Sequence, residues 1–248
     1  MLATAKRTGA VARRALQQLR RDHRFLGFSL AFPLVIIYFI KILFDVLANP
    51  LFEINVYVVP YGAFLVHFIT FILTAIVLVR ERTAETLARM FVSGYTQIEI
   101  IGGYIMAYSV LASVQSLLVL FELNTLFDLG FEALQLASVY LVMWLLAVIS
   151  MALGILASNF ARNEGQVFPF IPLVLVSIIL SGILVPVEKL PEWTQVLSYG
   201  TPLFYANEVL QNLIGGGALS DDWGGLASLP VYGLVVLSLA MFSLREMD

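Results

Sequence analysis

Six long apolar stretches separated by short polar segments are the feature of this sequence that most restricts its fold. Each has the roughly 20 residues that an α-helix needs to cross about 30 Å of hydrocarbon. The stretches are apolar throughout and do not alternate as the strands of a membrane barrel do. The sequence therefore predicts an all-α polytopic membrane protein with six transmembrane helices. We expect these spans at Phe25–Phe44, Val56–Val79, Ile100–Phe121, Leu134–Leu156, Val167–Val187 and Leu226–Leu244.

Composition supports a membrane protein with one transmembrane domain. Hydrophobic residues make up 60% of the chain and charged residues 12%, and a soluble domain could not hide so much apolar surface. We expect a single domain over residues 25–248, preceded by a separate segment at residues 1–24. That segment is not a cleavable signal peptide, because it lacks a short apolar core and its arginines continue to Arg24. The chain has no cysteine, which excludes disulfides and thiolate chemistry.

Lysine and arginine are distributed unevenly between the two sides that this arrangement creates. With the N-terminus inside, only Lys41 and Lys189 of the 14 basic residues lie on the outer side. Positive residues accumulate on the cytoplasmic side of membrane proteins. We therefore expect a multi-pass protein of the cytoplasmic (plasma) membrane with both termini cytoplasmic. The inner basic residues are Lys6, Arg7, Arg13, Arg14, Arg20, Arg21, Arg24, Arg80, Arg82, Arg89, Arg162 and Arg245.

Residues 1–24 are predicted to form an N-terminal amphipathic interface helix. Val11, Ala15, Leu16 and Leu19 recur at helical spacing, and arginines occupy much of the rest of the helical wheel. A basic amphipathic helix of this kind lies at the lipid surface with its arginines toward anionic head groups. We expect it to fix the topology, with membrane lipid as one partner, and also to support a partner protein.

The connection between the fifth and sixth spans is too apolar for a free loop and too interrupted for a span. Pro191, Gly200 and Pro202 break it. Short apolar helices of this kind are typical of re-entrant or interfacial segments, and irregular backbone at membrane depth persists only where protein or water satisfies it. We expect two short re-entrant outer helices, at Pro191–Tyr199 and Pro202–Ile214.

Motifs of catalysis and of nucleotide binding are absent from this sequence. It contains neither H-E-x-x-H nor G-x-S-x-G, and we expect no catalytic residue, no metal and no cofactor in this chain. The phosphate loop G-x-x-x-x-G-K-[ST] is also absent, so another chain binds ATP if the protein uses it. His67 lies in the middle of a span, where an ionisable residue is a candidate for function. We expect instead a neutral histidine packed against another helix, because no second histidine or in-span carboxylate is placed to join it.

The spans carry hydroxyl and amide side chains but no charged relay. Thr70 and Thr74 lie in the second span, and Ser113 and Gln115 in the third. Such side chains usually form hydrogen bonds between helices. A transport path lined by them suits an amphipathic or apolar cargo rather than a bare ion.

One inner connection, residues 80–99, has distinctive chemistry. From Arg80 to Met90 the sequence favours helix, with Glu85 four residues before Arg89. We expect a short charged helix, held between the second and third spans as a rigid docking element facing the cytoplasm. The alternative is a solvated loop whose arginines only set the topology.

Four stretches of the sequence resemble the membrane (permease) subunit of type-2 ABC exporters, the drug and lipid exporters of bacteria and archaea. "RERTAETLARMFVSGYTQIEIIGG" resembles the family's R-E-R-x-x-G-T-L-E segment, and "LSGILVPVEKLPEWTQVLSYGTPLFYANEVLQ" its S-G-x-x-x-P-x-x-x-L-P-x-W segment. "RRDHRFLGFSLAFPL" and "LGILASNFARNEGQ" are the other two. The chain departs from the family pattern in having Glu85 where glycine is usual, Ala88 in place of a glutamate, and Gly102–Gly103 where a lysine is common.

The resemblance implies partners that the sequence itself does not contain. Family members work with two copies of a separate ABC ATPase subunit, which binds ATP and Mg, and a second permease copy, identical or different, completes a twelve-span transporter. The segment between spans 2 and 3 would be the coupling helix that fits a groove of the ATPase. The interface helix would contact the ATPase too. By position, the coupling role falls on Arg80, Glu81, Arg82, Thr86, Leu87 and Arg89.

The resemblance also implies an exit and a substrate path. The re-entrant helices would close the exit, and Pro191, Trp193, Pro202 and Tyr205 are their candidate gate residues. Substrate cavities of the family lie between copies, mostly along spans 2 and 5. The path would therefore include Phe64, His67, Phe68 and Phe71, with Phe168, Phe170 and Pro172 opposite.

The function expected from these features is ATP-driven export of an amphipathic or apolar, drug-like or lipid-like substrate by alternating access. Two alternatives stay open at this stage. One is an exporter of a polysaccharide or polyprenyl-linked glycan, and the other is a membrane scaffold or channel that uses no ATPase. No nucleic-acid partner is expected.

Overall fold

Helices joined by short turns make up the computed structural model, which describes residues 2–47 and 54–243, and no strand occurs among them. In chain order the elements are α1 (Leu2–Arg21), α2 (His23–Leu47), α3 (Ile54–Thr83), α4 (Thr86–Val92), α5 (Gln97–Phe127), α6 (Ala133–Ser158), the 3-10 helix η1 (Glu164–Phe170), α7 (Ile171–Leu180), η2 (Val187–Lys189), α8 (Glu192–Ser198), α9 (Pro202–Ile214), η3 (Leu219–Asp222) and α10 (Trp223–Ser243).

Five helical segments of the described residues are long and apolar enough to cross a membrane. They are His23–Val46, Val56–Thr83, Gln97–Phe127, Ala133–Ser158 and Leu219–Ser243. Each contains one of the predicted spans, except that Leu244 at the end of the last one lies outside the described residues, as does Arg245. The all-α fold and five of the predicted long apolar helices are therefore confirmed.

The predicted span Val167–Val187 is wrong as a continuous regular helix. The segment begins as a 3-10 helix, becomes α-helical at Ile171 and ends at Leu180. Pro169 lies within the 3-10 turn and removes a backbone donor, which breaks the regular α-helical ladder. Gly182, whose φ is +83°, turns the chain away after the helix. The length of the apolar run therefore predicted a longer α-helix than the one that forms.

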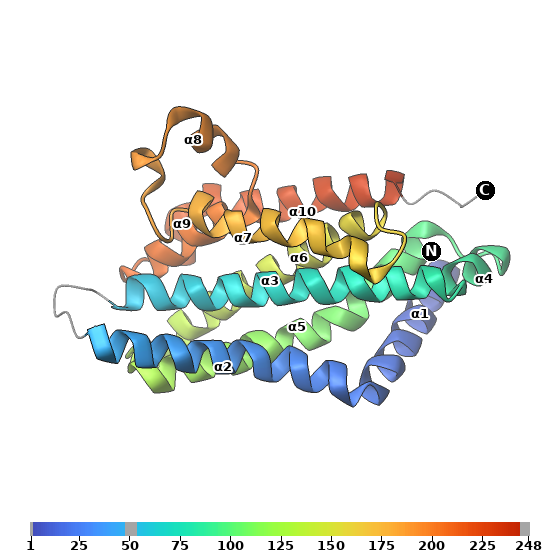
Figure 1. Cartoon of the computed structure of the whole chain (residues 1–248), viewed down its shortest axis with the longest axis horizontal. Coiled ribbons are helices and arrows are strands. Elements are labelled where there is room, and N and C mark those ends of the chain that lie inside the picture. The colour runs from blue at the N-terminus through green and yellow to red at the C-terminus, as the bar shows by residue number, and fades with distance from the viewer. Residues whose placement is uncertain (1, 48–53, 244–248) are drawn as a thin grey trace.

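The helices lie roughly side by side, and their ends gather at two opposite ends of the bundle (Figure 1). The start of α1, α4 and the end of α10 lie at one end, which we call the α4 end. The α9 end holds α8, α9 and the end of α2. From α6 the chain enters η1 near the α4 end and returns along α7 to the α9 end (Figure 1). The first and last described helices therefore begin and end on the same side.

The centre of the bundle is the contact between α3 and α6, where the two backbones approach closely. A Cβ added to Gly154 of α6 would lie 2.6 Å from the carbonyl oxygen of Phe71 in α3, so only glycine fits there. Ser150, one turn earlier on the same face of α6, is fully buried. Small residues at such contacts are the usual means by which membrane helices pack tightly.

The N-terminal helix α1 packs on protein with the face that was predicted to lie on lipid. Val11, Ala15 and Leu19 are buried and belong to the main hydrophobic core. A Cβ on Gly103 of α5 would lie 2.5 Å from Cβ of Val11, so α1 lies directly on α5. A helix therefore covers most of residues 1–24, but its apolar stripe is covered by α5 and not by a membrane interface.

Candidate functional site

The short helix α4 projects from the α4 end and is anchored by only two buried side chains. Leu87 and Met90 are buried, whereas the side chain of Val92 is 91% exposed. The helix begins at Thr86, after Glu85, whose φ of 56° and ψ of 18° place it in the left-handed region. A residue with a Cβ atom is strained in that region, whereas glycine is not. The departure from glycine at residue 85 therefore falls at a position where the backbone favours glycine.

Arg80, Glu81 and Arg82 belong to the last turns of α3, so the prediction of one charged helix from Arg80 to Met90 is wrong. Helix α3 continues to Thr83, and the left-handed residue Glu85 separates it from α4. Helical character was therefore predicted correctly, but the boundary was not. Of the six predicted coupling residues, only Thr86, Leu87 and Arg89 lie in α4. Arg89 donates to the Ala84 carbonyl and to the Thr86 hydroxyl, both within the turn that it follows.

The three charged residues at the end of α3 each join it to a different part of the fold. The Arg80 guanidinium donates to both oxygens of Glu164 in η1, at 2.8 and 3.1 Å. Arg82 donates to the carbonyl oxygens of Ser158 and Ala161 and, at 2.9 Å, to the side-chain oxygen of Asn159. Movement of the end of α3 is therefore coupled to η1 and to the end of α6.

Asn159 extends this connection to α10. Its side-chain amide donates to the Ala240 carbonyl at 2.9 Å and to the Ser243 hydroxyl at 2.7 Å, while its oxygen accepts from Arg82. The ends of α3, α6 and α10 are thus held by one polar side chain. Nothing in the sequence pattern singled out Asn159, because its partners lie about 80 positions away.

Glu81 is joined to α1 through a partly buried ion pair. Its carboxylate, 7% exposed, accepts from Arg14 at 2.7 Å, and Arg14 also donates to the Tyr104 hydroxyl at 3.3 Å. Partial burial opposes the charge on Arg14, but the hydrogen bond and the negative charge of Glu81 outweigh it and raise the pKa of the guanidinium. Arg14, first assigned to the charged face of α1, is therefore an internal contact of the α4 end.

The turn between α4 and α5 is held by the start of α1. Arg7 donates to the Gly94 carbonyl at 2.7 Å, lies 3.8 Å from the carboxylate of Glu99, and sits over the ring of Tyr95. Glu99 also closes the capping box with Thr96 that begins α5. Helix α4 therefore projects from a base that α1, α3 and α5 build together.

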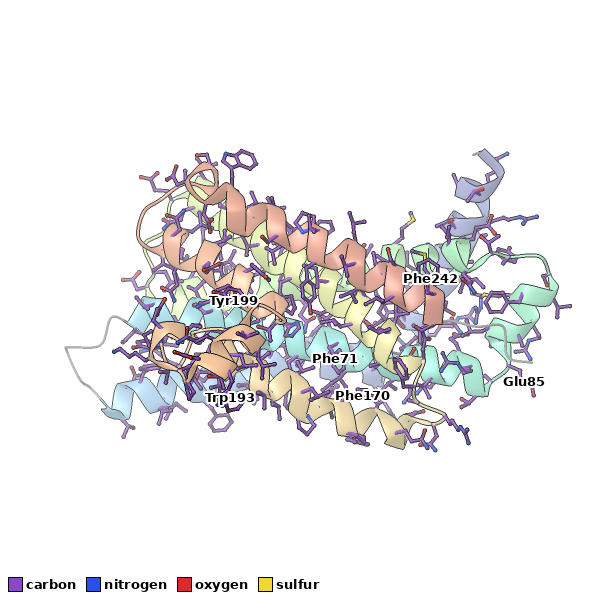
Figure 2. All side chains as sticks on the ribbon, turned by 90° about the horizontal axis from the view of Figure 1, so that it is seen from above. Phe71, Glu85, Phe170, Trp193, Tyr199 and Phe242 are labelled. Atoms are coloured by element: carbon purple, nitrogen blue, oxygen red, sulfur yellow. The ribbon has the colours of Figure 1, made fainter. Side chains whose placement is uncertain are left out.

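A cavity of about 260 Å³ lies between α3, α6, α7, α9 and α10, nearer the middle of the bundle. His67, Phe71 and Phe170, all predicted to line the path, are part of its wall. Apolar side chains make up most of the rest, with Ser177, Thr201 and Tyr232 as polar groups. Phe71 and Phe170 approach each other across this region (Figure 2). The structure thus brings together residues of the second and fifth predicted spans.

The other predicted path residues lie elsewhere. Phe64 and Phe68 stack on each other with ring centroids 5.8 Å apart, and Phe64 is buried in the main core. Phe68 packs partly against the cluster around Phe71. Phe168 is 65% exposed and does not line the cavity. Pro172 is exposed as well.

His67 is packed against another helix, as predicted. Its Nδ1 lies 2.5 Å from the Ser150 hydroxyl, which donates its own proton to the Leu146 carbonyl at 2.6 Å. With the single hydroxyl proton on the Leu146 carbonyl, Nδ1 of His67 is the donor of this pair. No group of three or more His, Cys, Asp and Glu side chains in the described ranges could hold a metal ion.

Two short helices, α8 and α9, lie where the two re-entrant helices were predicted, and they differ in how firmly they are held. Helix α9 begins at buried Pro202, as predicted, and Gln211 fixes it to α3 by donating to the Val56 carbonyl at 2.8 Å. Helix α8 stands away from the bundle (Figure 1), and Trp193, just after Pro191, is exposed. The Tyr205 hydroxyl donates to the Tyr199 carbonyl at 3.0 Å, so that α9 holds the end of α8.

The sequence profile of the family described as ABC-2 type transporter matches residues 6–214. The chain is 27% identical over 201 residues to "Probable multidrug ABC transporter permease YbhR" of Escherichia coli (strain K12), a match that covers 80% of this chain and 54% of that protein. It is 24% identical over 180 residues to "ABC transporter G family member 20" of Dictyostelium discoideum, covering 71% of this chain and 24% of that protein. The chain therefore spans about half the length of the first relative.

Proposed function

The chain belongs to the ABC-2 type transporter family, and from that premise we propose that it is the membrane half of an ATP-driven exporter of amphipathic or apolar substrates. The family makes it a membrane permease of an ABC transporter. One observation carries the rest of the proposal: α4 projects from the α4 end, and its last residue, Val92, is an exposed apolar side chain. An apolar side chain at the tip of a projecting helix is suited to insertion into a groove of another protein.

The partner at this surface is an ABC ATPase subunit, two copies of which bind ATP and Mg. Their closing would displace α4, and α3 would carry the displacement to η1 through Arg80 and to α6 and α10 through Arg82. Binding energy can shift the spans between inward and outward access only if the two states contact the ATPase differently. Thr86, Leu87 and Arg89 are the predicted coupling residues in α4. Arg80, Glu81 and Arg82 act behind them as transmitting contacts.

The α4 end faces the cytoplasm in this proposal. It carries most of the arginines of the described residues, including those of α1, and positive charge favours the inner side. The sixth crossing is made by η1 and α7. Seven residues at the 3-10 rise followed by ten at the α rise span roughly 29 Å, which is close to the hydrocarbon thickness.

The cavity favours a drug-like or lipid-like substrate over a glycan. Its wall is mostly apolar, and its three phenylalanines, Phe71, Phe160 and Phe170, are not accompanied by a ladder of polar groups. Concave and mainly apolar cavities with a few polar groups are the usual binding sites of small amphipathic molecules. The name of the Escherichia coli relative, a probable multidrug permease, points the same way. A second permease copy completes the transporter.

The proposal is tested by placing a charge on the tip of α4. Val92→Asp should abolish co-purification of the ATPase subunit with this chain, while Val46→Asp, at an exposed valine of α2 near the opposite end, should leave it intact. Both variants must reach the membrane at the wild-type level. If no nucleotide-binding subunit associates with the wild-type chain, or if Val92→Asp retains it, ATP-driven coupling through α4 is wrong.

A further inference from the structure

A second cavity, of about 220 Å³, lies at the α4 end and is separate from the one assigned to cargo. The elbow between α1 and α2, the end of α3 and the side of α5 form its wall. Leu19, Phe25, Val77 and Ala84 supply apolar surface, and the polar groups are those of Gln18, Asp22, Arg80, Glu81, Thr86 and Tyr108. This volume is far larger than the roughly 10–15 Å³ that one water needs. A ligand with both an apolar and a polar part would fill it.

Tyr108 points to a missing ligand. Its side chain is 6% exposed, and it lies in the wall of the cavity within electrostatic range of Glu81, Asp22 and Arg80. Among the described residues the Tyr108 hydroxyl has no hydrogen-bond partner, and its oxygen is not one of the fully buried unpaired atoms, so it is open to the cavity. A hydroxyl that is open to a cavity can take its partner from a ligand there.

Carboxylates outnumber cations among the charged groups around this hydroxyl, since Asp22 and Glu81 face one guanidinium, that of Arg80. One oxygen of Asp22 accepts from the Phe25 amide at 3.0 Å, and the other lies 3.9 Å from Arg80, too far for a hydrogen bond. Nε and Nη2 of Arg80 donate to Glu164, and Nη1, in the wall of the cavity, is the nitrogen that lies 3.9 Å from Asp22. Glu81, in the same wall, adds a second carboxylate, which Arg14 engages from outside the cavity. A positively charged group with several N–H donors therefore complements the cavity.

We propose that this cavity binds the primary ammonium headgroup of an aminophospholipid, of the phosphatidylethanolamine type. The ammonium would donate to the open oxygen of Asp22 and to the oxygen of Tyr108. The lipid phosphate would face the exposed arginines on either side of Asp22 in the chain, Arg21 and Arg24. The elbow directly precedes the first candidate membrane-spanning segment, which begins at His23, and the ends of such segments are where lipid headgroups lie.

The same geometry discriminates between headgroups. Choline has no N–H to donate to Asp22, and serine brings a carboxylate toward Asp22 and Glu81, which repel it. A bound ethanolamine headgroup would fasten the elbow to the end of α3 beside Thr86, where α4 begins. The site is independent of the cargo cavity and of the direction of transport, and it requires only that the elbow lies in the membrane.

Native mass spectrometry of the full chain with lipids of identical acyl chains tests the site. The wild type should retain phosphatidylethanolamine about tenfold better than phosphatidylcholine, the difference expected for one charged hydrogen bond. Asp22→Asn, which keeps the acceptor for the Phe25 amide, and Tyr108→Phe, which keeps the ring, should each reduce this preference toward parity. Tyr38→Phe, at an exposed tyrosine of α2, is the control and should not change it.

Three outcomes would overturn the proposal. Equal retention of the two lipids by the wild type would show that the headgroup is not recognised. A preference that survives both Asp22→Asn and Tyr108→Phe would place the recognition elsewhere. Displacement of the lipid by millimolar free ethanolamine would show that the ligand is the soluble amine and not the lipid.

Discussion

The Arg14 guanidinium donates to the Glu81 carboxylate at 2.7 Å, and so joins α1 to the last turns of α3 across 67 positions of sequence. The Tyr104 hydroxyl of α5 accepts a second hydrogen bond from the same guanidinium at 3.3 Å. Three helices therefore meet at one ion pair directly behind the start of α4. Charge at the α4 end serves to hold the base of the projecting helix as well as to face solvent.

We expect Arg14→Met to lower the stability of the chain by about 2 kcal/mol. The substitution leaves the Glu81 carboxylate buried without its charged partner, and the loss of a charged hydrogen bond costs about 1.5–3 kcal/mol. Thermal unfolding in detergent measures the change. Arg13→Met, at the exposed neighbour, is the matched control and should have little effect.

The double variant Arg14→Met with Glu81→Gln separates this pair from simple loss of packing. Glutamine removes the buried charge, so the double variant should be more stable than the sum of the two single changes predicts. Additive effects would mean that the two side chains do not interact, in conflict with the geometry.

Glu85→Gly should raise stability by about 0.5–1 kcal/mol. Residue 85 has a φ of 56°, where an L-residue costs about 1–2 kcal/mol, and part of this gain is offset by the greater chain entropy of glycine in the unfolded state. The measurement is again thermal unfolding. Ala88→Gly, three residues later inside α4, should instead destabilise by about 1 kcal/mol because it weakens a helix interior. A loss of stability in both variants would refute the strained turn.

The sequence predicted the elements whose signals are local. Helix α9 has its predicted bounds, Pro202–Ile214, because proline at the first turn and glycine after the last one mark both ends. The long apolar helices were found because their hydrophobic runs are unbroken. The error at Val167–Val187 came from the same reasoning, since that run is equally apolar but is wound partly as a 3-10 helix around Pro169 and ends before Gly182.

The residues that join the helices at the α4 end could not be found in one sequence. Arg14, Asn159 and Glu164 have partners 67 to 84 positions away, and pairs of this kind leave no periodic pattern. The same limit explains why Arg80, Glu81 and Arg82 were predicted to lie in an exposed helix. Their charge suggested solvent, whereas each is used inside the fold by a partner that the sequence does not identify.

Glu208 of α9 is expected to make the stability of the chain depend on pH. Partial burial, together with the negative charges of Asp222 and Glu188, raises the pKa of its carboxyl above the ordinary value. A carboxyl whose pKa is higher in the folded state favours folding at low pH, and this contribution is lost as the pH rises from the unfolded pKa of about 4.3 through the folded one. Glu208→Gln should therefore stabilise the chain at neutral pH and give no benefit below about pH 4.

Thermal unfolding of wild type and Glu208→Gln at a series of pH values checks this prediction. Glu192→Gln, at an exposed carboxylate of α8, serves as the control and should behave as the wild type does. If the advantage of Glu208→Gln is constant across the series, it comes from packing and not from titration.

A comparison of Phe170→Ala with Phe168→Ala tests whether the cavity of about 260 Å³ binds cargo. Phe170 lines it, whereas Phe168 is 65% exposed and lies outside it. Truncation of Phe170 to alanine removes about 1–2 kcal/mol of apolar contact with a bound substrate, which corresponds to a rise in KM of roughly 5- to 30-fold. Phe168→Ala leaves the cavity wall unchanged, so its KM should stay near that of the wild type.

Substrate-stimulated ATPase activity of the reconstituted complex measures both variants under the same conditions. The basal activity without substrate is the internal control, because neither residue lies in α4, the helix that the ATPase would bind. Val92→Asp should lose basal and stimulated activity together, whereas Phe170→Ala should lose only the response to substrate. Equal changes in KM for Phe170→Ala and Phe168→Ala would instead place the cargo outside this cavity, on the surface that Phe168 faces.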